Sequence, residues 1–456
     1  MRRDVRTESS ALSSSRGDTR AGAAARFPAT ARRTGPILFV SLFFPPDKTG
    51  IAPYSGRFVD HLKACGHEVD VITGVPHYPE WRIADDYRHR LRTIEVDGQV
   101  RVQRLRHFVP RRPGASGRAL YEASFFMHAM ARPLRRKPRL VLAVSPGLGG
   151  AGYAAALARR AGVPFGLYVQ DLVGKAARQS GLCSAGGVSS LTEWLESAVL
   201  RQADRVAIVA ESFRPAVVAA GVPEDHIHLV PNWTHIGCAQ QAIATTRRML
   251  GWPADATIVL HSGNMGAKQA LENVVQTAKL AATDAPELLF VLMGNGNQRS
   301  YLERIGAGLP NLRFVDPVSD SLYADALAAA DVLLVNERAT VIDMSLPSKL
   351  TSYFSVGRPV VAAVPSGGST ANEVRKSGGG VVVPAEDPIA LLTAINRVRL
   401  SPTLVNALSA SGWSYARRQL AADAAASRLD QFLDSLLSSA NVHCGQTLQR
   451  LPKENR

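Results

Sequence analysis

The residue types most suited to chemistry stand in loops that follow short apolar runs of the sequence. Such runs are typical of buried parallel strands, and ligands of open α/β sheets bind beyond the carboxyl ends of these strands. Two such loops contain a lysine close to a predicted helix: residues 262–268 end on Lys268, and residues 346–357 include Lys349. Backbone N–H groups at a helix start bind anions, and an ammonium group offsets negative charge. We therefore interpret both loops as candidate diphosphate-binding sites.

The second of these loops contains an electrostatic mismatch. Ser348 can cap the predicted helix, and Lys349 then lies in its first turn, where the helix dipole opposes a cation. A bound anion such as a phosphate would remove this mismatch. A third loop, Gly294-Asn295-Gly296, would let a ribose or a base approach the backbone. An ordinary glycine turn is the alternative for each loop, and residues 262–268 lack the Walker A pattern.

The first half of the chain contains three weaker candidates. Gly50 follows the first predicted strand and can expose backbone N–H groups to an anion, although a plain turn explains it equally well. Residues 147–152 form a GxGxxG at a predicted helix start, with Asp171 about twenty residues later, as in a dinucleotide-binding fingerprint. Tight packing of helix on strand is the alternative for this motif, and binding of a substrate hydroxyl is the alternative for Asp171. His77 lies in an irregular loop and is either a surface histidine or an acceptor-site group.

Strands and helices alternate along the chain in two series. The predicted strands are residues 37–40, 69–73, 100–105, 140–144, 165–169 and 207–209, followed by 257–261, 288–293, 312–315, 332–335, 360–363 and 381–383. Predicted helices include residues 119–132, 151–161, 271–282, 322–329, 350–356 and 390–398. Such alternation produces parallel, doubly wound sheets with right-handed crossovers. The predicted fold class is α/β, with two Rossmann-like domains whose parallel sheets face a central cleft.

The domain limits follow from where these two series start and end. We expect a disordered basic tail at residues 1–35, a first Rossmann-like domain at 36–225, a second at 226–405, C-terminal helices that pack back on the first domain at 406–436, and a polar tail at 437–456. The first segment holds eight arginines, and its composition cannot bury a core.

The overall composition indicates a globular protein and argues against some classes of binding site. The chain of 456 residues is 46% hydrophobic and 20% charged, which is ordinary for a globular protein. Aromatic residues make up only 6%, which argues against nucleic-acid binding by base stacking. The four cysteines are far apart and form no CxxC pair. Their spacing argues against a zinc site and against a disulfide framework, and it fits a reducing, cytoplasmic compartment.

The net charge of +15 is concentrated in parts of the chain. Residues 101–137 hold ten Arg and Lys against one acid, Glu122. A basic surface of this kind attracts nucleic acid, an anionic membrane or an acidic substrate, and charge alone does not separate these. A solvated helix is the alternative for this stretch. No run approaches the 18 or so apolar residues that span a bilayer.

Seven short segments lie in a characteristic order. They are FPPDKTGIA (44–52), PHYP (76–79), QDL (170–172), PNW (231–233), GNMGAKQ (263–269), GNG (294–296) and LPSKLT (346–351). In these segments and their order, the chain resembles the retaining glycosyltransferases of family 4, which have the GT-B fold. Within that family it is most similar to the colanic-acid-type enzymes that build bacterial surface polysaccharide.

The resemblance implies a nucleoside-diphosphate sugar, UDP- or GDP-linked, in the second domain and an acceptor in the first. Lys268 would contact the diphosphate, Gly294 and Gly296 would lie near the nucleoside, and no metal is needed. The sugar would arrive on the face from which its leaving group departs. The implied donor-binding residues are Gly50, Asn264, Lys268, Gly294, Gly296, Pro347, Ser348, Lys349 and Ser352. The implied catalytic residues are His77 and Asp171.

One departure from the family pattern concerns the donor. Many members carry two glutamates eight positions apart in the segment that contains the LPSKLT motif here, and the later one binds the donor ribose. The corresponding residues here are Met344 and Ser352, and Asp343 is a candidate substitute for the first glutamate. This difference bears on donor identity and on activity.

The predicted function is transfer of a sugar from this donor to a lipid-linked or polysaccharide acceptor at the inner face of the cell membrane. Three alternatives remain open from the sequence. They are an NAD(P)-dependent oxidoreductase that uses residues 147–152, a GT-B sugar-nucleotide epimerase, and a non-catalytic GT-B partner protein.

Overall fold

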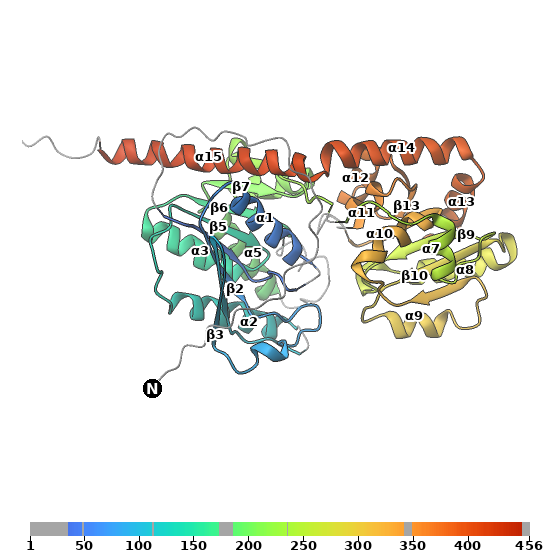
Figure 1. Ribbon diagram of the computed structural model, residues 1–456, viewed down its shortest axis with the longest axis horizontal. Coiled ribbons are helices and arrows are strands. Elements are labelled where there is room, and N and C mark those ends of the chain that lie inside the picture. Colours follow the sequence, from blue (N-terminus) through green and yellow to red (C-terminus); the bar gives the residue numbers. More distant parts are fainter. Residues whose placement is uncertain are drawn as a thin grey trace, which may run out of the picture. The chain divides into compact units, whose positions relative to one another are not determined.

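The computed structural model describes residues 35–47, 50–111, 114–172, 186–234, 236–341 and 349–448 (Figure 1). Side chains are described for all of these except residues 186–189 and 440–448. Met344, Pro347 and Ser348 lie outside the described residues, as do Asp343 and almost all of the predicted N-terminal tail.

An eight-stranded sheet organises the first half of the chain, in the order β3-β4-β2-β1-β5-β6-β7-β8. Its strands are β1 (Ile37–Ser41), β2 (Val69–Gly74), β3 (Arg92–Asp97), β4 (Val100–Leu105), β5 (Leu140–Ser145), β6 (Phe165–Val169), β7 (Arg205–Ile208) and β8 (Ile227–Leu229). All neighbours pair in parallel except β3, which runs antiparallel to β4. The helices of this half are α1 (Ala52–Ala64), α2 (Ala115–Met130), α3 (Leu148–Ala161), α5 (Gly186–Leu200) and α6 (Arg214–Ala219).

A six-stranded parallel sheet organises the second half, in the order β11-β10-β9-β12-β13-β14. Its strands are β9 (Thr257–Ser262), β10 (Leu288–Met293), β11 (Leu312–Val315), β12 (Val332–Asn336), β13 (Val360–Ala363) and β14 (Gly380–Val383). Its helices are α7 (Ile243–Met249), α8 (Glu272–Asp284), α9 (Arg299–Ile305), α10 (Asp320–Ala329), α11 (Lys349–Ser355), α12 (Ser369–Ser377) and α13 (Pro388–Arg399). The predicted fold class, with two parallel-sheet α/β domains, is confirmed.

Apolar burial explains why these segments form central strands. Every residue of β1, β5, β6 and β10 is buried, as expected for strands covered by helices on both faces. The sequence prediction omitted β3 and β8. Strand β3 alternates polar and apolar residues at the sheet edge, and β8 contains only three residues, so neither produces a continuous apolar run. Helix α3 begins at Leu148 rather than at the predicted Ala151.

Two helices follow the second sheet, α14 (Pro402–Gln419) and α15 (Ala422–Leu448). Helix α14 starts with a Ser401 hydroxyl that accepts from the N–H of Leu404, and it packs on α11 and α13. Helix α15 returns to the first sheet, where it contacts β7 and β8 (Figure 1). It continues to Leu448, so residues 437–448, predicted as part of a polar tail, are helical. No helix in the described part of the chain has both the length and the hydropathy to span a membrane.

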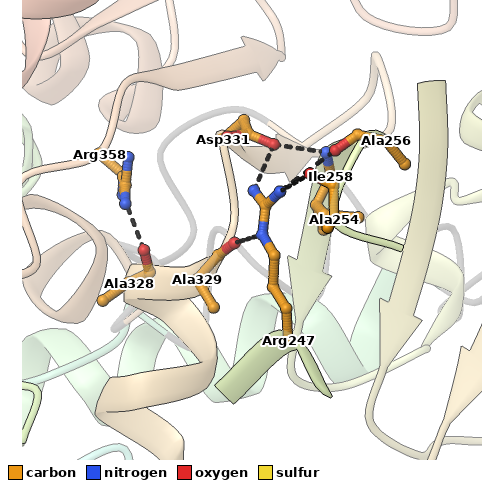
Figure 2. A network of polar contacts seen from close by, with 8 residues as sticks. All are labelled: Arg247, Ala254, Ala256, Ile258, Ala328, Ala329, Asp331 and Arg358. Atoms are coloured by element: carbon orange, nitrogen blue, oxygen red, sulfur yellow. Dashed lines mark hydrogen bonds and ion pairs between the residues drawn. The ribbon is translucent and has the colours of Figure 1, made fainter. Parts of the chain in front are cut away.

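A polar network fixes the amino ends of β9 and β12, at the sheet edge opposite the loops that follow these strands (Figure 2). Arg247 of α7 donates to Asp331 Oδ2 at 2.6 Å and to the carbonyl oxygen of Ala329 at 2.9 Å. The same Asp331 oxygen accepts from the N–H of Ile258 at 2.7 Å. The network therefore fixes the position of β9 relative to β12 along the strand direction. The candidate site lies at the opposite ends of these two strands.

Candidate functional site

The loops after β9 and β10 meet at the carboxyl edge of the second sheet. The two strands pair in register up to Ser262 and Met293, so their loops leave the sheet side by side. The N–H of Gly263 donates to the carbonyl oxygen of Met293 at 2.9 Å, and the N–H of Met265 donates to that of Asn295 at 2.8 Å. The structure therefore brings the two predicted glycine loops into one layer.

Close backbone contact explains why glycine stands at two of these positions. Gly294 has a φ of +147°, and a Cβ atom there would lie 1.9 Å from the carbonyl oxygen of Gly263. Gly296 has a φ of +159°, and a Cβ atom there would lie 2.5 Å from the carbonyl oxygen of Met265 and 2.7 Å from Asn264 Oδ1. Both glycines are therefore required for the loops to pack, and this packing positions Asn264.

Lys349 reaches this layer from the first residue of α11. Its Nζ atom lies 3.4 Å from His261 Nε2 and 3.7 Å from the position that a Cβ atom on Gly263 would occupy. Tyr353 of the same helix fixes the distance, because its hydroxyl accepts from the N–H of Ser262 at 2.9 Å. Burial lowers the pKa of Lys349 to about 8, although the nearby carboxylate of Glu337 acts in the opposite direction.

Glu337, which was not predicted from the sequence, is the acidic residue that interacts with Lys349 and Lys268. It follows β12 directly, is buried, and accepts from the Thr370 hydroxyl at 2.8 Å. Burial raises its pKa to about 7, while Thr370, Lys349 and Lys268 each favour the ionised form. Its position just after a predicted strand is typical of a ligand-binding residue. An acidic side chain, however, does not fit the pattern of a cationic loop that binds an anion.

The remaining donor-side predictions fall in two environments. Asn264 and Lys268 are exposed at the loop surface, where Lys268 lies in the short 3₁₀ turn η4 (Ala267–Gln269). Ser352 is only 1% exposed, inside α11. Pro347 and Ser348 lie outside the described residues. The described part of the site thus combines two lysines, one buried glutamate and glycine-lined backbone, an arrangement suited to a polyanion.

His77 lies in an aromatic cluster of the first domain and is 2% exposed. Its Nδ1–H donates to the carbonyl oxygen of Val75 at 2.8 Å, and its Nε2 accepts from the Tyr121 hydroxyl at 3.0 Å. Phe43, Trp81, His107 and Tyr121 surround the ring. Burial lowers the pKa of His77, which disfavours the protonated ring. The alternative that His77 is a surface histidine is wrong, because its apolar neighbours enclose it.

Asp47 joins the two predicted loops of the first domain. Its carboxylate accepts from the backbone N–H of His77 at 3.2 Å and from that of Tyr78. Burial raises its pKa to about 6. Gly50, with a φ of +68°, packs against the Tyr78 ring, 3.2 Å from the position of a Cβ atom. The structure therefore brings Gly50, Asp47 and the segment around His77 together.

Asp171 follows β6 in the QDL segment. Burial raises the pKa of its carboxyl to about 7, and Lys268 partly offsets this effect. The preceding Gln170 forms a reciprocal amide pair with Asn232, with hydrogen bonds of 3.0 and 2.8 Å. This pair connects the QDL and PNW segments, so it determines where Asp171 lies.

At the GxGxxG motif, a carboxylate of the protein itself stands where a bound anion would lie. Because α3 begins at Leu148, most of the motif lies within the helix. The Glu122 carboxylate accepts from the N–H of Gly149 at 2.7 Å and from that of Leu148, which satisfies the helix N-terminus. A Cβ atom on Gly149 would lie 2.3 Å from the carbonyl oxygen of Glu122. These glycines serve helix packing, and the dinucleotide interpretation is not favoured.

Two α/β domains with largely parallel sheets, and glycine and lysine loops at the carboxyl edge of the second sheet, are the arrangement expected for a GT-B glycosyltransferase. Residues 49–233 match the family described as glycosyl transferase 4-like domain, and residues 256–399 match glycosyl transferases group 1. The chain belongs to glycosyltransferase family 4, as the motif order predicted.

Curated relatives of the chain include bacterial glycosyltransferases. The chain is 33% identical over 334 residues to the putative colanic acid biosynthesis glycosyl transferase WcaI of Escherichia coli K12, a match that covers 70% of this chain and 81% of the relative. It is 28% identical over 275 residues to a D-inositol 3-phosphate glycosyltransferase of Thermomonospora curvata, which covers 56% of this chain and 62% of that protein.

Solved structures with the same fold include two proteins at low sequence identity. Sucrose-phosphate synthase of Thermosynechococcus elongatus aligns with a TM-score of 0.68 and 19% identity, over 89% of this chain and 100% of that one. HepE of Anabaena, in complex with UDP-glucose, aligns with a TM-score of 0.62 and 16% identity, over 88% and 99% of the two chains. These likenesses establish the fold.

Proposed function

We propose that this enzyme transfers a sugar, with retention of configuration, from a nucleoside-diphosphate sugar to a lipid-linked or polysaccharide acceptor of surface polysaccharide biosynthesis. The arrangement of Lys268 and Lys349 around glycine-lined backbone is the observation that carries the donor assignment. The UDP-glucose in HepE and the colanic acid role in the name of WcaI support the donor class and the pathway class, respectively.

In this proposal, the two lysines bind the diphosphate of the donor. Lys349 contributes an ammonium group together with the N-terminus of α11, and Lys268 contributes one from the β9 loop. The backbone of Gly294 and Gly296 lies against the nucleoside, with Asn264 beside it. Ser352 and the two residues outside the described range, Pro347 and Ser348, belong to the same donor-binding segment.

The chemical step requires stabilisation of the departing diphosphate. Negative charge builds up on the bridging oxygen as the glycosidic bond breaks, and preorganised cations at that position lower the barrier. Lys268 and Lys349 meet this need without a metal ion. Before the donor binds, Glu337 balances part of the lysine charge. When the donor binds, its phosphates replace the carboxylate as the counter-charge.

The acceptor side of the proposal uses Asp171, His77 and Gly50. Asp171, with a pKa near 7, can accept a proton or a hydrogen bond from the acceptor hydroxyl. His77 Nε2 could contact an acceptor only if it lost its hydrogen bond with the Tyr121 hydroxyl. We therefore assign His77 a structural role in the part of the acceptor site formed by Asp47, Gly50 and Tyr78. Gly50 lets the first loop pack closely on Tyr78 in the same part of the site.

A thermal-shift screen across UDP, GDP, dTDP and NAD tests the donor assignment. A ligand that binds the native state raises the melting temperature by mass action. We expect UDP or GDP to raise it and NAD to leave it unchanged. Stabilisation by NAD alone would refute the assignment, and no response to any nucleotide would favour a non-catalytic partner protein. NMR of the anomeric proton in the product then tests retention.

We further propose that the enzyme works at the inner face of the cell membrane and contacts it through the basic stretch 101–137. Helix α2 in this stretch exposes Leu120 (51%), Met127 (65%) and Met130 (44%). Apolar side chains beside arginines are suited to an anionic interface. Neutral substitutions of Arg132, Arg135 and Arg136 are expected to weaken binding to phosphatidylserine vesicles. Unchanged binding would assign the stretch to ordinary solvation.

A further inference from the structure

Helices α1 and α15 bring three metal-ligating side chains together. His61 Nε2 lies 2.7 Å from Asp430 Oδ1 and 3.8 Å from Cys65 Sγ. All three potential ligand atoms lie within 4.8 Å of one another. Among the described residues, no other group of His, Cys, Asp and Glu side chains meets this condition. We propose that this cluster binds a divalent transition-metal ion of the zinc class.

The distances fit such an ion with small adjustments. Zinc bonds to sulfur, nitrogen and oxygen measure about 2.0–2.3 Å, so tetrahedral ligands lie about 3.3–3.8 Å apart. The separation between Cys65 and His61 already falls at this value. The distance between His61 Nε2 and Asp430 Oδ1 must lengthen by less than about 1 Å. The two atoms would then lose one hydrogen bond and each form a bond to the metal.

The fold holds the ligands in place on both sides. His61 lies in the last turn of α1 and Cys65 is its C-cap residue four positions later, so both side chains lie on the same side of the helix end. On α15, Phe432 and Leu433 are buried against the first domain. Ser435 of α15 also accepts a hydrogen bond from Arg205 Nε at 2.5 Å. Asp430 is therefore presented to α1 by a helix that is already fixed.

The local charge favours a cation. The Asp430 carboxylate supplies a negative charge at the cluster, 2.7 Å from His61 Nε2. A bound dication would deprotonate the Cys65 thiol, because the thiolate is the form that binds metal. With side-chain exposures of 18% for His61 and 25% for Asp430, the cluster is open enough for metal entry. Water would supply the fourth ligand.

The position of the cluster indicates a structural role. Cys65 precedes the amino end of β2, whereas the proposed substrate-binding loops follow the carboxyl ends of the strands. A metal here would tie α15 to the first domain. The cysteine spacing in the sequence argued against a zinc site. It could not reveal this cluster, since the proposed third ligand, Asp430, lies more than 360 residues further along the chain.

Cobalt substitution tests the proposal on the full-length protein after removal of metal with a chelator. Bound thiolate produces a sulfur-to-cobalt charge-transfer band, and we expect this band at one cobalt per chain. C65S is expected to abolish the band. C238S, which alters an exposed cysteine outside the cluster, is expected to retain it. D430N is expected to weaken zinc affinity, measured by calorimetry, by at least about tenfold.

Folding controls make the outcome decisive. Zinc is expected to raise the melting temperature of the wild type and of C238S but not that of C65S. Circular dichroism at the start of each titration confirms that the variants are folded. Absence of the cobalt band in the wild type, or a band that survives in C65S, would overturn the proposal. Equal zinc affinity of D430N and the wild type would also overturn it, because the cluster would then be an ordinary His–Asp hydrogen bond.

Discussion

Replacement of Lys349 by methionine provides the sharpest test of the donor site. Methionine keeps most of the side-chain volume and removes the charge that lies beside Gly263 and His261. A hydrogen bond between an ammonium group and a phosphate contributes about 1.5–3 kcal/mol. Since about 1.4 kcal/mol corresponds to a factor of ten, K349M is expected to weaken UDP or GDP binding by about ten- to hundred-fold.

The lowered pKa of Lys349 adds a pH signature. In the free enzyme its pKa is about 8, so the ammonium form dominates below pH 8 and is lost above it. A bound diphosphate requires that form, so binding at higher pH must take up a proton. Nucleotide affinity of the wild type is therefore expected to fall about tenfold or more between pH 7.5 and 9.5, and K349M should lack this decline.

The assay is isothermal calorimetry with the nucleotide that the thermal-shift screen selects. K279M is the matched control, because Lys279 is an exposed lysine on α8 outside the site. The melting temperature of free K349M should equal or exceed that of the wild type at pH 7.5, since burial disfavours the ammonium that is removed. Equal affinities and equal pH profiles for K349M and the wild type would refute the role of Lys349. A loss in K279M as well would indicate a non-specific charge effect.

Three further perturbations test the packing that surrounds the site. E122A leaves N–H groups at the start of α3 unpaired and is expected to lower the free energy of unfolding by about 1–3 kcal/mol in guanidinium titrations, with no change in the response to NAD. G294A places a methyl group against the carbonyl oxygen of Gly263 and should lower the melting temperature and abolish nucleotide binding; a fully stable, binding-competent variant would contradict the close contact. Burial lowers the pKa of His107 to about 3, so the unfolded chain takes up a proton below about pH 6.5 that the native ring excludes, and stability is lost as pH falls. H107F should therefore reduce the stability lost between pH 7 and pH 5 by about 2 kcal/mol, and an unchanged pH dependence would contradict a neutral buried His107.

The central strands and their parallel arrangement were predictable from local sequence. Apolar runs such as residues 140–144 and 288–293 can only be buried, and their alternation with amphipathic helices specifies parallel sheets. The glycine loops were predictable for the same reason, because they follow strands that pair side by side. Strand β3 was missed because an edge strand with one solvated face lacks a continuous apolar run.

The charged partners within the site were not predictable in this way. Lys349 was recognised from its place at a helix start, but its proximity to Glu337 depends on β12 and α11 meeting at one sheet edge. The motif at residues 147–152 matched a dinucleotide fingerprint, and only tertiary packing placed the Glu122 carboxylate on its helix N-terminus.

The sequence by itself determined which segments are buried, the class of fold and the family of the protein. Burial of apolar surface depends on the residue types within a short stretch of sequence, so buried segments can be predicted from the sequence alone. Tertiary structure alone decided which polar groups meet: His77 with Tyr121, Glu337 with Thr370, and His61 with Asp430. Hydrogen bonds and metal sites require atoms within a few ångströms of each other, and packing sets such distances between residues that lie far apart in sequence.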